Sequence, residues 1–243
     1  MKKITCFMLI FCIGLALSME AQECNLSGKE DLETVKNHYP ECTVDDSLLK
    51  EAFNFALSYF PEFEHLTIKV KFKKMKYSML CRPTLRSLRI PPRSYIIAVN
   101  NDTKNPLHPL NAGFKALTGC FGHELAHIVT YKNQSKKELI SDCFRYLFSR
   151  QFRRNYERQT DIITAQKGLG FENYLFEKYL EKFVDPSKGF LKKRYKTYSR
   201  SEDLWKIFLE YNPENTDQAF ILRQDLLHRS PVSGRTIPRF FLE

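Results

Sequence analysis

Two histidines four residues apart, with a glutamate directly after the first, are the residues of this chain best suited to chemistry. They form an HExxH sequence from His123 to His127 inside an apolar run. On a helix, residues four apart share one face, so both imidazoles can bind one metal ion. Glu124 lies one step further round the helix and can reach a water molecule at that metal. The pattern predicts zinc ligands at His123 and His127 and a general base at Glu124; the alternative is a pair of ordinary helix histidines.

A third protein ligand must come from farther along the chain. Glu157 follows His127 by thirty residues, which leaves room for one helix to end and another to return. Asp161 stands four residues later on the same helical face, where it can hold the free ring nitrogen of a ligand histidine. Glu138 follows His127 by only eleven residues, from where a return to the metal is hard. We therefore expect Glu157 as the ligand and Asp161 as the supporting acid; a solvated acidic pair is the alternative.

These motifs, HELAH followed by ExxxD, resemble the gluzincin metallopeptidases. In particular they are similar to the group that contains HtpX, Oma, the CAAX prenyl proteases and the small soluble minigluzincins, most clearly over residues 95–168. The resemblance implies zinc ligands, a general base and a histidine-supporting acid at the matching positions, which are His123, His127 and Glu157, Glu124, and Asp161. The family usually has alanine directly before that acid, where this chain has Thr160.

Zinc peptidases of this kind also need a donor for the oxyanion. The resemblance implies His228 and Arg235, which lie roughly where the family has a His and Arg pair, although the spacing differs. Tyr195 and Tyr198 are the other candidates. In the family, the strand before the metal helix is the sheet edge along which an extended peptide docks. The strand expected over Tyr95–Asn100 would take that place, unless it is an ordinary core strand.

The segments that must position these residues are predicted by hydrophobic periodicity. An apolar-periodic stretch that ends at a proline predicts a helix over Leu48–Phe60. Alternation of apolar residues with lysines predicts a half-buried strand over Thr67–Met75, and an apolar run closed by a turn predicts a second strand over Tyr95–Asn100. Prolines between Cys81 and Arg93 indicate a loop with short extended pieces.

Helices are expected over most of the remaining chain. The metal helix spans Leu110–Tyr131, unless its glycines delay its start. Ser135 and Glu138 form a capping box that opens a long helix to about Lys167, and this helix carries Glu157. Further helices are expected over Phe171–Phe183, over Leu204–Leu209 after a second capping box at Ser199 and Glu202, and over Thr216–Leu227. The expected fold class is α+β: with the resemblance, a mostly helical, zincin-like domain with a small sheet packed on the HExxH helix.

The first 21 residues read as a secretory signal peptide. Lys2 and Lys3 precede an apolar run from Cys6 to Leu17, which is too short for a comfortable membrane span. We expect cleavage, export to the periplasm or the exterior, and one domain over residues 22–243. An uncleaved N-terminal anchor is the alternative. No other stretch of the sequence is long and apolar enough to cross a bilayer, so no transmembrane domain is expected in the mature chain.

Charge and cysteine content narrow the possible partners. The net charge of +10 comes from dispersed lysines and arginines, without a zinc-finger, RNP or helix-turn-helix signature, so no specific nucleic-acid binding is expected. A solvated basic surface, or an anionic partner or surface, would account for this charge.

Export permits disulfides, and Cys24 with Cys42 or Cys120 with Cys143 could pair. Cys120 could instead be a thiolate ligand or a buried structural cysteine.

The motifs and the resemblance together predict an exported zinc-dependent metalloendopeptidase, with Zn2+ as cofactor and a peptide or protein as substrate. Three other interpretations stay open. The first is a catalytically silent gluzincin fold that binds a partner in the manner of a chaperone or inhibitor. The second is a basic exported binding protein whose HELAH sequence is accidental, and the third is a zinc hydrolase that acts on a non-peptide bond.

Overall fold

The computed structural model describes residues 47–75, 77–84, 93–102, 108–183, 189–215, 217 and 220, and the account below concerns these residues. Several expectations lie outside the described residues and remain predictions: the signal peptide over 1–21, the Cys24–Cys42 pair, most of the helix over 216–227, and the oxyanion donors His228 and Arg235.

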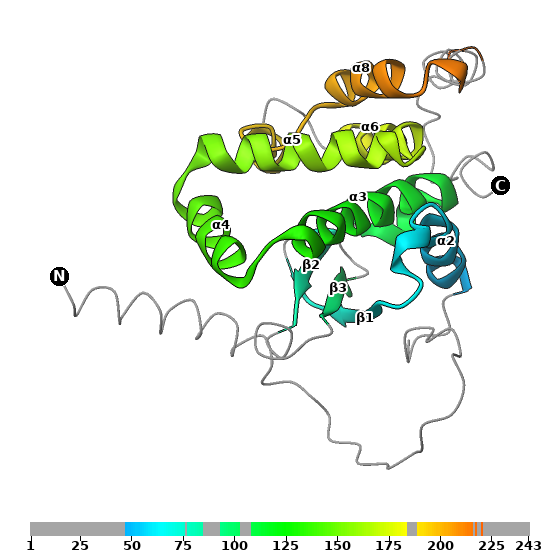
Figure 1. The fold of residues 1–243 in the computed structure, drawn as a ribbon. Coiled ribbons are helices and arrows are strands. Elements are labelled where there is room, and N and C mark those ends of the chain that lie inside the picture. The colour runs from blue at the N-terminus through cyan, green and yellow to red at the C-terminus, as the bar shows by residue number, and fades with distance from the viewer. Residues whose placement is uncertain are drawn as a thin grey trace. The chain divides into compact units, whose positions relative to one another are not determined.

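A three-stranded sheet forms one layer of the fold (Figure 1). Its strands are β1 (Thr67–Lys73), β2 (Met79–Pro83) and β3 (Ser94–Asn100), in the order β1-β3-β2. β3 runs parallel to β1 and antiparallel to β2. Successive side chains of a strand point to opposite faces, so the burial of the consecutive residues Ile97, Ala98 and Val99 means that both faces of β3 are covered.

The sheet differs from expectation at two strands. The strand before the metal helix, which the resemblance placed at the sheet edge, is the central strand β3, and β2 is an edge strand instead. The alternative of a core strand is therefore what the structure shows. β2 begins at Met79, where no strand was expected, and its last residues, Cys81–Pro83, form one of the short extended pieces expected between residues 81 and 93. Its last residue is Pro83, which has no N–H to continue the ladder.

Helices make up most of the rest of the described chain, and they are α2 (Ser47–Ser58), α3 (Phe114–Asn133), α4 (Lys136–Phe148), α5 (Arg150–Gln166), α6 (Gly170–Phe183), α7 (Gly189–Arg194) and α8 (Ser201–Tyr211). Short 3-10 turns lie at Pro61–Phe63, Pro109–Ala112 and Pro213–Asn215. α3 packs on the sheet through β2 and on α5 and α6, which α8 covers in turn (Figure 1). The expected fold class is thus confirmed as α+β and mostly helical, with a small sheet on the HExxH helix. Within the described ranges, none of the helices has the length and apolar character to cross a membrane.

Two glycines determine where the central helix α3 begins and how closely α6 packs against it. Twelve of its twenty residues are buried. It begins at Phe114 rather than Leu110, because Gly113 has a φ of 78° that a right-handed helix does not allow. A Cβ at Gly119 would lie 2.1 Å from the backbone carbonyl carbon of Glu172. Gly119 therefore lets α6 cross α3 at close contact, which accounts for a glycine inside a buried helix.

The long helix expected over residues 135–167 is in fact two helices. Ser149 is extended, with φ −111° and ψ 109°, and its Oγ accepts the N–H of Phe152 at 3.2 Å. It therefore ends α4 and caps the N-terminus of α5. The capping box at the start of α4 is present as expected: Ser135 Oγ accepts the N–H of Glu138 at 3.3 Å, and Glu138 Oε2 accepts the N–H of Ser135 at 2.7 Å. The break at Ser149 turns the chain so that α5 packs along α3.

Candidate metal centre

Side chains from α3 and α5 converge on one point. His123 and His127 extend from α3 and Glu157 from α5, and one ligand atom of each lies within 4.8 Å of the others. Glu157 Oε2 is 3.2 Å from His123 Nε2 and 3.7 Å from His127 Nε2. Bonds of about 2.1 Å to a tetrahedral metal ion would separate two ligand atoms by about 3.4 Å. The three predicted ligands therefore lie at separations that suit a zinc ion.

Each imidazole is held through its other ring nitrogen. His123 Nδ1 is 3.0 Å from Asp161 Oδ1, and an ionised carboxylate only accepts, so Nδ1 carries the proton. His127 Nδ1 is 3.2 Å from Thr160 Oγ1, whose hydroxyl donates to the backbone oxygen of Tyr156 at 3.0 Å. Because its own proton is used in this way, Thr160 Oγ1 accepts a hydrogen bond from His127 Nδ1–H. In the neutral rings both Nε2 atoms are left with a lone pair, as metal binding requires.

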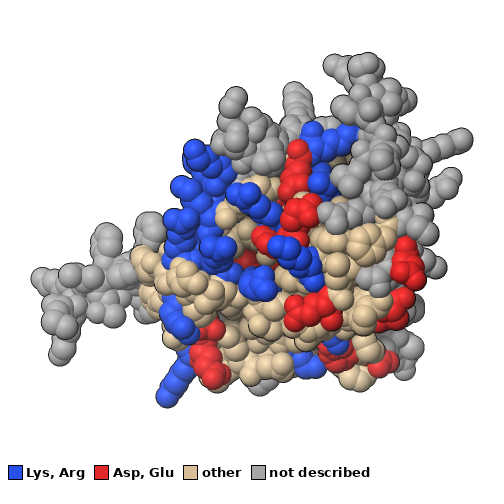
Figure 2. All heavy atoms as spheres, turned by 90° about the horizontal axis from the view of Figure 1, so that it is seen from above, with Lys and Arg blue, Asp and Glu red and all other residues tan. Residues whose placement is uncertain are grey.

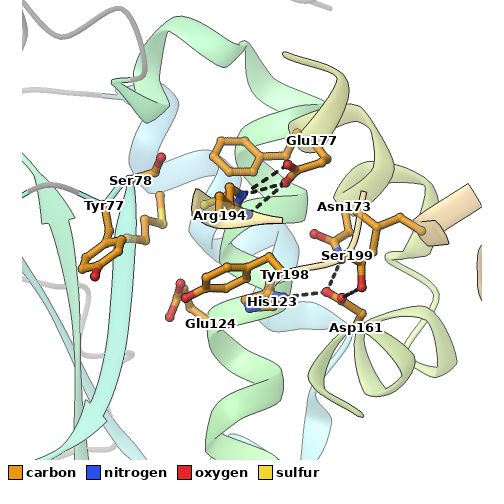
Figure 3. A pocket seen from close by; sticks show the side chains of 14 residues that line it. Tyr77, Ser78, His123, Glu124, Asp161, Asn173, Glu177, Arg194, Tyr198 and Ser199 are labelled. Atoms are coloured by element: carbon orange, nitrogen blue, oxygen red, sulfur yellow. Dashed lines mark hydrogen bonds and ion pairs between the residues drawn. The ribbon is translucent and has the colours of Figure 1, made fainter. Parts of the chain in front are cut away.

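Asp161 is itself fixed by two further donors (Figure 3). Asn173 Nδ2, from α6, donates to its Oδ1 at 3.1 Å. Ser199 Oγ, from the segment before α8, donates to its Oδ2 at 2.6 Å. The carboxylate of Asp161 therefore has hydrogen-bond partners on α3, on α6 and in the segment before α8. Neither residue was predicted as a donor to Asp161, because both reach it only through the packing of separate segments.

The role expected for Ser199 was a different one. We expected it to form a capping box with Glu202, but α8 begins at Ser201. Asp203 Oδ2 accepts the N–H of Arg200 at 3.3 Å, so the acid that caps this helix is Asp203. The expected capping box was wrong, and the hydroxyl of Ser199 is used at the metal centre instead.

The carboxylate of Glu157 is almost fully buried, with 1% of the residue exposed. Tyr146 of α4 donates a hydrogen bond to its Oε1, which leaves Oε2 facing the histidines. Burial alone would raise the pKa of Glu157, but the hydrogen bond with His123 and the charge of His127 hold it at about 2. The group is therefore ionised at neutral pH, as a metal ligand must be.

The two histidines differ in protonation when no metal is bound. Burial lowers the pKa of both rings. In His123 the hydrogen bonds with Asp161 and Glu157 outweigh burial and raise the pKa to about 10. In His127 burial prevails and the pKa falls to about 4. A proton on His123 thus takes the place of the metal ion, and metal binding must displace it.

Glu124, the expected general base, lies on α3 beside these ligands. It is 7% exposed and lines the same cleft as His123 (Figure 3). Burial raises its pKa to about 7, and the charge of Glu157 adds to this, whereas the charge of His123 and the backbone of Cys81 in β2 lower it. A carboxyl group with a pKa near neutrality can both take up and return a proton at working pH.

A cleft lies beside the cluster, and His123 and Glu124 line it (Figure 3). The side chain of His123 is 13% exposed there. The cleft runs from the start of β2 to α6 and the chain around α7, and its walls include Tyr77, Met79, Phe176, Glu177, Arg194 and Tyr198. Solvent can therefore reach His123.

Of the two tyrosines considered as oxyanion donors, Tyr198 lines the cleft, whereas the Tyr195 hydroxyl donates to a carboxylate of α6 at 3.0 Å. The ring of Tyr198 lies 6.4 Å from that of His123. Burial raises the pKa of Tyr198 well above its ordinary value, so its hydroxyl keeps a proton to donate. Arg194 stacks on this ring at 4.2 Å and forms an ion pair with Glu177 at 2.8 Å, a pair that the sequence did not reveal.

The other ligand candidates lie away from the cluster. Glu138 is exposed and caps α4. Cys120 lines the cleft but is not among the three clustered ligands. It is buried, whereas Cys143 is exposed, and among the described cysteines neither forms a disulfide. The possible Cys120–Cys143 pair is therefore not formed.

Comparisons of the chain with protein-family models, with curated proteins and with solved structures found no match.

Proposed function

We propose that the protein is a zinc-dependent metallopeptidase of the gluzincin type that acts on peptide or protein substrates. The observation that carries the proposal is the convergence of His123 Nε2, His127 Nε2 and Glu157 Oε2, with Glu124 beside them. Two imidazoles and one carboxylate form a ligand set of catalytic zinc sites, which keep one further position open. The cleft at His123 supplies that opening.

The chain's own residues suit peptide hydrolysis. When bound, zinc supplies Lewis acidity, which polarises a scissile carbonyl and makes a water molecule acidic enough to attack at neutral pH. Glu124 accepts the proton of the attacking water and passes it to the leaving amine. Tyr198 lines the cleft, and in this proposal its hydroxyl donates to the oxygen that becomes negative.

The edge strand β2 favours a peptide as the substrate. It is at one end of the described sheet, and its first residue and the two before it line the cleft. An extended peptide can add to such an edge by backbone hydrogen bonds and would then pass His123 and Glu124. Tyr77 and Leu80, which are 51% and 37% exposed, offer apolar contacts along the way. Export, expected from the first 21 residues, belongs to the same proposal.

The test combines zinc content with cleavage of protein substrates, on the chain from residue 22 onward. We expect about one zinc ion per wild-type chain and a strong loss of zinc in Glu157→Ala. Glu124→Gln should keep the zinc ion and lose cleavage, because the amide cannot accept the proton. Glu138→Ala, which removes an exposed carboxylate from the α4 cap, is the control and should keep both properties.

Each contrary result points to a different alternative. Cleavage that survives in Glu124→Gln would remove Glu124 as the base. Zinc bound without cleavage of any peptide or protein would favour a catalytically silent gluzincin fold or a non-peptide substrate. Wild-type protein without zinc would make the HELAH sequence accidental.

A further inference from the structure

Helix α4 turns apolar side chains toward solvent. Its outward side carries five residues at helical spacing, Ile140, Cys143, Phe144, Leu147 and Phe148, which we name the α4 stripe. Ile140, Leu147 and Phe148 are 49%, 44% and 67% exposed. The one apolar residue of α4 that is buried is Leu139. Of the described elements, α4 packs chiefly on α5, so the stripe is not needed for the core.

The α4 stripe is more than scattered surface residues. Single exposed apolar side chains are common on soluble proteins and carry no meaning. Here they follow one another over two turns of one helix, and the rings of Phe144 and Phe148 stack at 6.4 Å. A contiguous apolar strip of this kind marks an interaction surface.

Basic residues surround the α4 stripe. Lys136 and Lys137 begin the helix, and Arg150 and Arg154 follow its far end, all four of them exposed. Between residues 136 and 158 the chain has seven lysines and arginines and three acids, of which one, Glu157, is buried in the metal centre. Arg150 Nε also donates to the backbone oxygen of Lys196 at 3.4 Å, which brings the basic segment after α7 next to the start of α5.

The basic side chains gather at this end of the compact helical unit. Figure 2 shows Lys and Arg crowded on the left half of the face seen from above, the side on which Figure 1 places α4 and the start of α5. The exposed residues Arg150, Arg154, Arg158, Lys192, Lys193 and Lys196 belong to these segments. The basic side chains of the described residues are therefore concentrated on one side of this face.

We infer that the α4 stripe and its basic surroundings dock on the anionic surface of a lipid bilayer. Apolar residues flanked by Lys and Arg are the features of helices that lie in the bilayer interface, where the apolar side chains enter the headgroup region and the cations meet anionic lipids. The stripe ends at the corner between α4 and α5, where Phe148 is 67% exposed. A second copy of the chain on the same surface would place like charges opposite one another, which disfavours self-association.

This docking goes beyond the proposed peptidase activity and does not depend on it. The opposite side of α4 carries Tyr146, which donates to Glu157. The docking surface and the metal centre are thus on two sides of one helix, and docking would hold the centre close to the bilayer. Chains that lie at that surface would be the substrates within reach.

The test is sedimentation with lipid vesicles of the chain from residue 22 onward, since the apolar run from Cys6 to Leu17 would itself bind lipid. We expect binding to phosphatidylcholine vesicles that contain phosphatidylglycerol, weaker binding to pure phosphatidylcholine, and loss of binding at high salt. The double variant Leu147→Ser/Phe148→Ser should lower the vesicle partition coefficient at least about tenfold. Phe55→Ser, at a residue of α2 that is 44% exposed, is the matched control and should bind as the wild type does.

The charge contribution is tested in the same way. Lys136→Glu/Lys137→Glu should lower binding at least about tenfold, whereas Lys69→Glu/Lys71→Glu, two exposed lysines of β1, should lower it much less. Circular dichroism and thermal unfolding establish that each variant is folded, and Glu124→Gln should bind vesicles like the wild type.

Several results would overturn the inference. Wild-type protein that stays in the supernatant with anionic vesicles would do so, as would control variants that lose binding as strongly as the α4 variants. A wild-type dimer in light scattering that Leu147→Ser/Phe148→Ser dissociates, without vesicle binding, would make the α4 stripe a contact between two copies instead.

Discussion

Thr160 stands where the gluzincin resemblance leads one to expect alanine, and its hydroxyl links His127 to α5. It donates to the Tyr156 backbone oxygen and accepts from His127 Nδ1. His127 and Thr160 are both buried, so the ring nitrogen of His127 would be left unsatisfied in the core without this acceptor. Asp161, the next residue, does the same for His123. Thr160 and Asp161, neighbours on α5, thus orient the two histidines. Thr160 does so without adding a second buried charge beside Asp161.

We expect the substitution Thr160→Val to weaken zinc binding, because it keeps the shape of the side chain but removes the acceptor for His127 Nδ1. The dissociation constant for zinc should rise by about ten- to a hundredfold. Thr160→Ser keeps the hydroxyl and is the control. Both constants can be measured by competition with a chromophoric chelator. Equal zinc affinity in Thr160→Val and wild type would mean that the hydroxyl does not position His127.

The centre was predictable where its residues are close in the sequence. HExxH fixes His123 and His127 on one helical face through their spacing alone, and the spacing of Glu157 and Asp161 does the same on α5. Tyr146, Asn173 and Ser199 could not be predicted, because each contacts the centre only through the way in which separate helices cross. Residues that support a site across elements leave no local pattern.

At the scale of elements, periodicity predicted which segments are helices and strands but not how they are divided and ordered. The apolar pattern runs through Ser149 without interruption, so only the hydrogen bond from the Phe152 N–H to its side chain reveals the helix end. The residue types of β3 do not decide whether it is an edge strand or a central strand. β3 is central because β2, a short strand that ends at a proline, pairs with its other side. Sheet order is a long-range property that single-strand composition does not encode.

Gly119 is the contact on which the packing of α3 against α6 depends. Gly119→Ala would place a methyl group 2.1 Å from the Glu172 carbonyl carbon and 2.4 Å from the Asn173 nitrogen, so the two helices must separate. We expect a loss of more than about 2 kcal/mol in the free energy of unfolding. Gly122→Ala should lose less, because its nearest neighbour is the movable Cδ1 of Leu169 at 2.7 Å. Urea unfolding of both variants gives this ranking, and an equal or reversed ranking would contradict the role of Gly119.

At the scale of the whole molecule, the candidate metal centre joins α3, which packs on the sheet, to α5, which packs among the other helices. Three acids are buried at this junction, Glu124, Glu157 and Asp161. Without a metal ion, the proton on His123 offsets part of their charge. Metal binding and the stability of the fold are therefore linked through that proton.

This linkage predicts how stabilisation by zinc depends on pH. In the metal-free protein the pKa of His123 is raised from 6.5 to about 10, so its protonation stabilises the fold fully below pH 6.5, and that contribution is lost as the pH rises toward 10. In the zinc-loaded protein His123 is a neutral ligand, so no such loss occurs. The difference in free energy of unfolding between the two forms should widen from pH 7 to pH 9, by up to about 1.4 kcal/mol per pH unit. Urea unfolding with stoichiometric zinc and with a chelator measures this difference. The metal-free form of His123→Gln, which cannot titrate there, should not lose stability in this way from pH 7 to pH 9. A wild-type difference that is constant or narrows with pH would show that no proton is displaced from His123.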